Sequence, residues 1–352
     1  MTRENTKRIQ VGSLFLGGDA PVSVQSMCNT KTWDVDATVQ QIRAMQAAGV
    51  DIVRIAIPDR RAALAVDRIK EQVSVPLVAD IHFDHQLALL CAERGIDKIR
   101  INPGNIGGEE NVRAVAAACR ERGIPIRIGV NAGSLEKPLL AKYGHPCPEA
   151  LVESARSHVE LLEKAGFTDI CLSLKTSDVP MTIAAYRLAS ESFPYPLHLG
   201  VTETGTEWNG TIQSAVGIGT LLCEGIGSTI RVSLTADPVK EVSAGIAILK
   251  AAGLRKGGVK FVSCPTCGRT EIDLIGLAEE VEKRVHMLDR DITVAVMGCV
   301  VNGPGEAREA DYGIAGGRGK GLLFRKGAVL GTYPSEELCD RLLSLIQEET
   351  NG

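Results

Sequence analysis

Three cysteines in the last third of the sequence have the spacing of a metal site. Cys264 and Cys267 form a C-x-x-C turn in FVSCPTCGRT, and Cys299 stands alone in the later segment VMGCVVNGPGE. Pro265 favours a tight turn that points both sulfurs of the pair in the same direction. Thiolates at strand ends can converge on one metal or cluster. Three buried core cysteines are the alternative, but a C-x-x-C turn followed by a loop cysteine favours a metal.

The fourth ligand of such a site is not obvious from spacing. Zinc commonly takes two C-x-x-C pairs, or one pair with histidines, whereas this segment has no second pair and His286 falls inside an expected helix. A [4Fe–4S] cluster suits three cysteines better. Cys339 lies in the amphipathic segment SEELCDRLLSLI, which is typical of a packing residue. Glu306 follows the NGPG loop; a carboxylate is a weak iron ligand that could leave and expose one iron. A solvated surface glutamate remains the alternative.

The elements before this segment alternate between short apolar runs and amphipathic stretches. Eight such strand–helix units predict a (β/α)8 TIM barrel. A doubly wound open sheet is the competing interpretation, but no G-x-G-x-x-G follows the first run. Residues 9–24 resemble a hairpin that could plug the bottom of the barrel. The eight runs are 21–27, 52–58, 76–81, 98–104, 125–130, 169–175, 196–203 and 228–235.

The pattern changes after Gly253. The segment LRKGGVK is a basic, glycine-bearing junction, and the following residues carry strands and helices of their own. The fold class is therefore α/β, with a TIM barrel followed by a smaller α/β iron–sulfur domain. We expect a substrate domain over residues 1–255 and a cluster domain over residues 260–352.

Polar residues stand late in many of the apolar runs, where barrel enzymes place their active sites. Several cations pointing into one barrel mouth repel each other unless an anion lies among them. One guanidinium group can bind two phosphate oxygens at once, so the pattern predicts a phosphate or diphosphate substrate. Glu203 could position a hydroxyl or serve as an acid. The remaining residues of this set are Arg54, Asp80, His82, Arg100, Asn102, Arg127, Asn131, Lys175, Arg231 and Ser233.

Composition narrows the class of protein further. The formal net charge is -4, whereas a binder of nucleic acid or of an anionic membrane is usually basic. The first ten residues are polar, as a signal peptide is not, and no apolar run approaches the roughly 20 residues of a membrane span. The ten cysteines should then be reduced thiols. These features indicate a cytoplasmic protein with a small-molecule substrate.

Several motifs together resemble one enzyme family from end to end. The chain is similar to the 4-hydroxy-3-methylbut-2-enyl diphosphate synthases of the methylerythritol phosphate pathway, the GcpE/IspG family, in their compact bacterial form. It departs at Cys28, where threonine or another small residue is expected, and no catalytic assignment depends on that position. The motifs are VSVQSMCNT, VADIHFD, IRINPGNIG, RIGVNAGSL, LSLKTSDV, LGVTETG, IRVSLTADP, VSCPTCGRT and VMGCVVNGPGEA.

The resemblance implies a reductive ring opening of 2-C-methyl-D-erythritol 2,4-cyclodiphosphate with loss of water. Two electrons would arrive from flavodoxin or ferredoxin through a [4Fe–4S] cluster. The resemblance also implies a homodimer in which the cluster domain of one subunit caps the barrel of the other. Glu203 matches an acidic residue proposed to assist at the substrate. The implied cluster ligands are Cys264, Cys267, Cys299 and Glu306, and the implied diphosphate contacts are Arg54, Arg100, Arg127 and Lys175, with Asn131, Arg231 and Ser233 nearby.

Two other interpretations account for part of the pattern. The first is a TIM-barrel transferase or lyase that acts on a phosphorylated or pterin-like ligand, with a structural zinc module at its C-terminus. The missing second C-x-x-C pair favours iron over that reading. The second is a scaffold protein with fortuitous cysteines, which leaves the strand-end cations unexplained.

Overall fold

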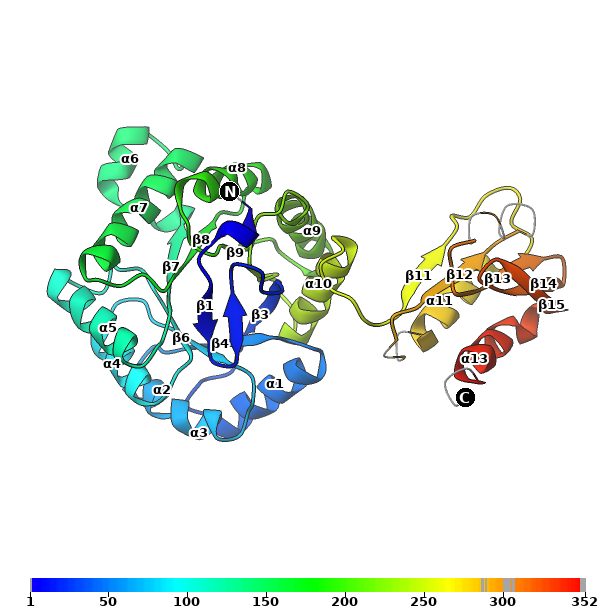
Figure 1. Ribbon diagram of the computed structural model, residues 1–352, viewed down its shortest axis with the longest axis horizontal. Helices are drawn as coiled ribbons and strands as arrows, with labels where there is room; N and C mark the ends of the chain where they lie inside the picture. Colours follow the sequence, from blue (N-terminus) through cyan, green and yellow to red (C-terminus); the bar gives the residue numbers. More distant parts are fainter. Residues whose placement is uncertain (1, 286–287, 289, 300–304, 306–307, 349–352) are drawn as a thin grey trace. The chain divides into compact units, whose positions relative to one another are not determined.

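The structure is a computed structural model that describes residues 2–285, 288, 290–299, 305 and 308–348 (Figure 1). The chain divides into two compact units, Met1–Arg255 and Lys256–Gly352. Each unit has a hydrophobic core of its own. In the part of the chain that is described, no helix is both long and apolar enough to cross a membrane.

The first unit is built on an eight-stranded sheet in the order β8-β7-β6-β5-β4-β3-β10-β9, and all of its pairings are parallel. A parallel bridge between Leu172 and Leu197 joins β8 to the residues just before β9. This bridge closes the sheet, so the predicted TIM barrel is confirmed. The strands are β3 (Ser23–Met27), β4 (Ile52–Ala56), β5 (Leu77–Asp80), β6 (Lys98–Ile101), β7 (Ile126–Asn131), β8 (Ile170–Lys175), β9 (His198–Leu199) and β10 (Thr229–Ile230).

Helices surround the barrel and bury their apolar faces against it (Figure 1). Many begin at an aspartate, such as Asp34 or Asp178, whose carboxylate accepts a hydrogen bond from a backbone N–H of the first turn. The helices are α1 (Val35–Ala47), α2 (Arg60–Leu64), α3 (Val66–Lys70), α4 (His85–Glu93), α5 (Glu109–Glu121), α6 (Lys137–Tyr143), α7 (Pro148–Lys164), α8 (Val179–Ser192), α9 (Glu207–Cys223) and α10 (Pro238–Ala251).

A hairpin precedes the barrel, as the sequence predicts. Strands β1 (Ile9–Val11) and β2 (Leu14–Leu16) pair antiparallel. Their apolar side chains form one cluster with Ile52, Val78 and Cys171, which lie at or near the N-terminal ends of barrel strands. The hairpin therefore closes the bottom of the barrel.

The registers of the barrel strands define which side chains share a level in the interior. In such a barrel the interior side chains lie in levels of four, and each level takes its residues from alternate strands. Because the strands are tilted, the residue that belongs to a level shifts by one position, relative to the paired residue, from each strand to the next. Such levels usually hold Val, Ile and Leu, but here they are strongly polar. Going up from the hairpin, the lower level is Ile52, Lys98, Cys171 and Thr229, the middle level is Gln25, Val78, Arg127 and His198, and the upper level is Arg54, Arg100, Ser173 and Arg231.

The second unit contains a five-stranded sheet and two helices, α11 (Leu274–Val285) and α13 (Leu338–Glu348). Strands β11 (Lys260–Ser263), β12 (Thr293–Met297) and β13 (Tyr312–Gly317) run parallel, and β14 (Lys320–Arg325) and β15 (Ala328–Pro334) continue the sheet antiparallel. Cys339 is buried in the core of this unit, so its interpretation as a packing residue is confirmed.

The local sequence of β13 gives little indication of a strand. The segment of β13, YGIAGG, is rich in glycine, which weakens a strand on its own. Neighbouring side chains occupy the space that its glycines leave: a Cβ on Gly313 would lie 2.3 Å from the ring of Phe324, and one on Gly316 would lie 2.1 Å from Ile272. Tertiary packing, and not local propensity, therefore forms β13.

Candidate active site

A cavity of about 240 Å³ lies at the C-terminal ends of the barrel strands. Most of the strand-end residues predicted from the sequence meet in its wall. Ser173 and Thr202 also line it, and these two carry no charge that would have marked them in the sequence. The full lining is Arg54, Asp80, His82, Arg100, Arg127, Asn131, Ser173, Lys175, Thr202 and Arg231.

Asp80 connects the cations on one side of this cavity. Its carboxylate lies 3.2 Å from Nη1 of Arg100, 3.9 Å from Nε of Arg54 and 3.4 Å from Nε2 of His82. Burial alone would raise the pKa of Asp80, but Arg54, the hydrogen bond to His82 and Arg100 together hold that pKa well below its usual range. Asp80 is therefore ionised and keeps these side chains in place.

Glu241 and Met27 hold two of the arginines that line the cavity. The sequence analysis identified neither residue. Glu241, which is buried on α10, accepts hydrogen bonds from Nε and Nη2 of Arg231, each at 3.3 Å. It also accepts from the Ser26 hydroxyl at 2.8 Å and from the backbone N–H of Leu234 at 3.0 Å. The Met27 sulfur accepts from Nε of Arg54 at 3.0 Å. A glutamate within a helix and a methionine at a strand end give no distinguishing sequence signal.

Positive charge exceeds negative charge around the cavity. Five cationic side chains line it, and Asp80 and Glu241 are the carboxylates that contact them among the described residues. Burial, followed by repulsion from Arg127, Arg231, Arg54 and Arg100, lowers the pKa of Lys175 well below its ordinary value. Burial and repulsion from Arg100 lower the pKa of Arg127 to about 10. A bound anion would relieve this repulsion.

Glu203 lines a neighbouring cavity of about 480 Å³, which shares Asn131, Lys175 and Thr202 with the first. Its backbone has φ of 58°, a left-handed conformation that costs a non-glycine residue on the order of 1–2 kcal/mol. The Thr204 hydroxyl donates to the carbonyl of Ser233 at 2.6 Å and holds the loop in place. Strain of this kind is often retained where a side chain has to be placed for function.

Asn102 and Ser233 lie near these cavities but are not among the residues that line them. The Asn102 side chain accepts the backbone N–H of Gly104 at 3.1 Å, which fixes its own loop. The Ser233 hydroxyl is buried and has no hydrogen-bond partner within the described residues.

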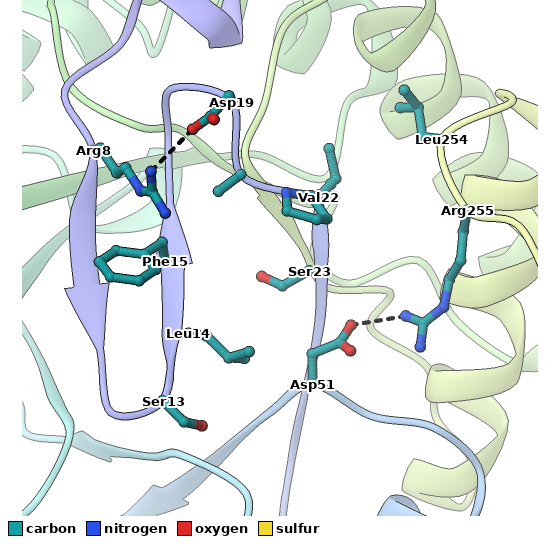
Figure 2. Close-up of a pocket in the computed structure, with 12 residues that line it drawn as sticks. Arg8, Ser13, Leu14, Phe15, Asp19, Val22, Ser23, Asp51, Leu254 and Arg255 are labelled. Atoms are coloured by element: carbon teal, nitrogen blue, oxygen red, sulfur yellow. Dashed lines mark hydrogen bonds and ion pairs between the residues drawn. The ribbon is translucent and has the colours of Figure 1, made fainter.

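A larger pocket, of about 530 Å³, lies at the opposite end of the barrel beside the hairpin (Figure 2). Figure 2 shows that both of its arginines already have a partner: Arg8 lies 3.3 Å from Asp19, and Arg255 lies 2.8 Å from Asp51. Its charges therefore balance, and it lacks the positive excess that a diphosphate requires. The smaller cavity at the strand C-termini is the better candidate for the active site.

The cysteines of the second unit stand at the ends of neighbouring parallel strands. Cys264 directly follows β11, and Cys299 follows β12 after Gly298. The backbone N–H of Gly298 donates to the Cys264 sulfur at 3.1 Å. A Cβ on Gly298 would lie 2.8 Å from a terminal methyl of Leu274, so a larger residue at this position requires that side chain to shift.

Thiol chemistry separates these cysteines from those of the barrel core. Burial raises the pKa of Cys28, Cys91 and Cys119 to about 12, so they remain protonated. The exposed Cys267 behaves in the opposite way, because hydrogen bonds from the backbone and side chain of Arg269 lower its pKa. Thiolates are the form that binds metals. Cys267 therefore forms a thiolate, the form that can bind a metal, more readily than the buried cysteines of the barrel do.

Glu306 is the fourth ligand that the family resemblance implies. Glu306 lies outside the described residues. Within those that are described, no group of three His, Cys, Asp or Glu side chains is arranged closely enough to hold a metal ion.

Comparison with known proteins gives matches along the whole chain. The GcpE TIM-barrel domain matches residues 6–246, and the GcpE protein C-terminal domain matches residues 260–348. A protein of Clostridium perfringens (strain 13 / Type A) is 59% identical over 99% of both chains, and one of Geobacter sulfurreducens is 60% identical over 98% of both. Both are named 4-hydroxy-3-methylbut-2-en-1-yl diphosphate synthase (flavodoxin).

Among solved structures, dihydropteroate synthase from Stenotrophomonas maltophilia is similar to the barrel. Its TM-score is 0.52 at 14% identity, and the match covers 70% of this chain and 97% of that one. This likeness concerns the fold alone. The two family models and the full-length relatives are more specific, and they establish that the chain belongs to the GcpE family.

Proposed function

We propose that this protein converts 2-C-methyl-D-erythritol 2,4-cyclodiphosphate into 4-hydroxy-3-methylbut-2-enyl diphosphate, as an iron–sulfur oxidoreductase of isoprenoid precursor biosynthesis. The names of relatives that are 59% and 60% identical support this reaction. The observation that carries the proposal is the cavity at the barrel mouth, where five buried or half-buried cations face few carboxylates. That surplus of guanidinium and ammonium groups suits a diphosphate.

Arg54, Arg100, Arg127, Lys175 and Arg231 bind the diphosphate oxygens in this proposal. Asp80 and Glu241 orient the arginines, because each carboxylate contacts their N–H groups. His82 lies beside Asp80 and Arg100 and closes the same wall. Asn131 and Thr202 offer polar atoms where the two cavities meet, and they suit the hydroxyl groups of the substrate. Asn102 and Ser233 shape the surrounding loops.

A [4Fe–4S] cluster held by Cys264, Cys267, Cys299 and Glu306 is the proposed cofactor. The acceptor sulfur of Cys264 and the lowered pKa of Cys267 suit thiolate ligands. A bound cluster would pass on, one at a time, the two electrons that the donor supplies and that the ring opening consumes. Glu306 would be the weak ligand of the set, because carboxylates bind iron less strongly than thiolates do.

Glu203 is the proposed acid–base residue. The reaction breaks a carbon–oxygen bond of the ring and releases one hydroxyl group as water, so the departing oxygen has to gain a proton. Glu203 lines the cavity next to Lys175, and its backbone keeps a left-handed conformation there. Glu203 is exposed, so its carboxylate can exchange protons with the solvent.

Flavodoxin is the proposed electron donor, as the names of the relatives indicate. We further propose a homodimer in which the cluster domain of one subunit covers the barrel of the other. This arrangement would bring a cluster to a substrate that is held by arginines of a different unit. The proposed setting is the cytoplasm, and neither a nucleic acid nor a membrane is required as a partner. The alternative of a transferase or lyase with structural zinc is not favoured, because both domains match the GcpE models.

Anaerobic purification of the full chain tests the cofactor and the activity together. The protein should be brown, should contain iron and sulfide, and should turn over the cyclic diphosphate with reduced flavodoxin. Glu306→Ala should lose iron or turnover while the barrel stays folded. Glu309→Ala, which removes an exposed carboxylate close by in the sequence, is the control. A colourless protein with stoichiometric zinc would contradict the proposal.

A further inference from the structure

The floor of the barrel is lined by polar groups, and Arg127 is the only one of them that the proposed reaction uses. The lower and middle levels contain Gln25, Lys98, His198 and Thr229, as well as Arg127. Each of these side chains is between 0% and 1% exposed. A barrel core normally fills this space with Val, Ile and Leu. The hairpin below and the substrate cavity above enclose these two levels.

Many polar atoms in these two levels have no hydrogen-bond partner within the described residues. Burying one such atom costs on the order of 1–3 kcal/mol, and an unpaired buried charge costs more. A set of this size in one place is consistent with a bound polar ligand. The atoms are both side-chain atoms of Gln25 (Nε2 and Oε1), Nζ of Lys98, Nε and Nη1 of Arg127, both ring nitrogens of His198 and Oγ1 of Thr229.

The charges of these groups identify the kind of ligand. Lys98 and Arg127 are both cations, and neither level contains a carboxylate. The carboxylate of Asp80 lies above them and already contacts Arg54, Arg100 and His82. Gln25 adds a neutral N–H₂ donor, and a neutral His198 adds one ring N–H. The donors therefore outnumber the acceptors, and the set carries an uncompensated positive charge.

We propose that the interior of the barrel binds a monovalent inorganic anion of the halide class, held by Lys98, Arg127 and the Gln25 side-chain amide. The site lies below the diphosphate cavity, shares Arg127 with the floor of that cavity, and does not depend on the proposed reaction. A halide suits it because it is spherical and accepts N–H groups from several directions. A diphosphate would not fit between four-residue levels that the hairpin closes from below.

The titration behaviour of Lys98 and His198 agrees with this assignment. Burial, together with repulsion from Arg127 and Arg54, lowers the pKa of Lys98 to about 8. Burial and the surrounding cations hold the pKa of His198 well below its usual range, so its ring is neutral and keeps one N–H to donate. An anion in this space would stabilise the charged form of Lys98.

Crystals of the full-length protein grown with bromide in place of chloride test the site directly. Data collected at the bromine absorption edge should show one anomalous peak within hydrogen-bond distance of Nζ of Lys98 and the guanidinium of Arg127. Density at this position without anomalous signal would identify water and overturn the proposal. The complete absence of a peak inside the barrel would overturn it as well.

A solution measurement separates specific binding from the high salt of a crystal. The thermal midpoint of the full-length holoprotein is followed while bromide replaces gluconate at constant ionic strength. The midpoint should rise with bromide in the wild type and in the control Lys142→Met, which removes an exposed lysine. It should be independent of bromide in Lys98→Met, which keeps the length of the side chain but not its charge. An unchanged bromide dependence in Lys98→Met would refute the site.

A second variant keeps the test informative if Lys98→Met does not fold. Gln25→Met removes a neutral donor from the middle level and keeps the two cations. It should weaken the bromide dependence, with a higher half-saturating concentration, without abolishing it. If Lys98→Met fails to fold, a bromide response of Gln25→Met that equals the wild-type response contradicts the proposal.

Discussion

Arg231 shows how a single side chain in the cavity depends on residues elsewhere in the sequence. It follows the short strand β10, but its guanidinium is held by Glu241, on the helix that comes next. Ser26 and the backbone of Leu234 bind the same carboxylate, so Glu241 has little freedom to move. Glu241 is thus a positioning residue, and its effect reaches the substrate only through Arg231.

Replacement of Glu241 by glutamine should weaken substrate binding. Glutamine keeps the size of the side chain but cannot accept two charge-assisted hydrogen bonds from Arg231. Such bonds contribute roughly 1.5–3 kcal/mol, so KM should rise about tenfold to a hundredfold, with a smaller change in kcat. Steady-state kinetics with the cyclic diphosphate measure both constants. Glu207→Gln, on the exposed start of α9, should leave both unchanged, and a Glu241→Gln enzyme with wild-type KM would show that Arg231 needs no such partner.

Binding of a diphosphate should be accompanied by proton uptake. The pKa of Lys175 lies below its ordinary value of 10.5 in the protein, because burial and four arginines disfavour the charged form. An anion favours that form and raises the pKa again. Lys175 therefore takes up a proton on binding at any pH between its pKa in the free protein and its higher pKa in the complex. Titration calorimetry in buffers of different ionisation enthalpy, from neutral to alkaline pH, measures the number of protons.

Lys175→Arg is the matched variant for this measurement. Arginine keeps the positive charge but stays protonated in water over this range of pH. Its proton uptake should fall toward zero while binding persists. Equal uptake in Lys175→Arg and in the wild type would assign the proton to another group of the cavity.

At the scale of elements, the short apolar runs predicted the barrel strands well because each is followed by an amphipathic stretch in a regular alternation. One face of a strand is apolar and packs on helices, and the other carries polar residues such as Arg54 or Arg100 into the barrel. Because the C-terminal ends of all the strands surround one mouth of the barrel, the side chains at these ends come together there. Met27 and Glu241 could not be predicted, since their role depends on where Arg54 and Arg231 come to lie. The strand β13 could not be predicted either, because its glycines are covered by Phe324 and Ile272 from distant segments.

A side chain at Gly298 should disturb the turn after β12. A Cβ there would meet Leu274 at 2.8 Å and Thr270 at 3.3 Å, next to the sulfur of Cys264. We expect Gly298→Ala to displace the turn and to lower the iron content of the purified protein by more than half, as a cluster ligand moves by a few tenths of an ångström or more. Iron and sulfide analysis measures the loss.

Gly268→Ala is the control for this element. Gly268 follows Cys267 directly, but a Cβ at this position meets nothing within 4 Å. Its iron content should equal that of the wild type. Equal iron contents in both variants would show that the close packing around Gly298 does not matter for the site.

At the scale of the whole molecule, the division into two units has a thermodynamic meaning. The barrel and the second unit have separate clusters of buried apolar residues, with the boundary between Arg255 and Lys256. Arg255 is anchored on the barrel through Asp51 at 2.8 Å and the carbonyl of Gly49 at 3.1 Å. A fragment that ends at Arg255 therefore retains its own core and its last anchor.

Residues 1–255 expressed alone should fold. The fragment should unfold cooperatively in urea, with helix and strand signals in circular dichroism like those of the barrel. It should also bind inorganic diphosphate, since all of the cations in the cavity belong to it. Arg127→Met in the same fragment is the control for specific binding. An unfolded fragment would show that the barrel depends on the second unit for its stability.

The polar interior has a consequence for how the barrel forms. Most barrels gain free energy when aliphatic side chains meet in the middle, but here the inward positions of β6 and β7 carry Lys98, Arg100 and Arg127. Bringing these strands together without a counter-ion is unfavourable, whereas docking each helix on the outside of its strand is not. The outer layer should therefore assemble first, and closure of the ring between Leu172 and Leu197 should come late. Refolding rates that increase with halide concentration would be the kinetic signature of that order.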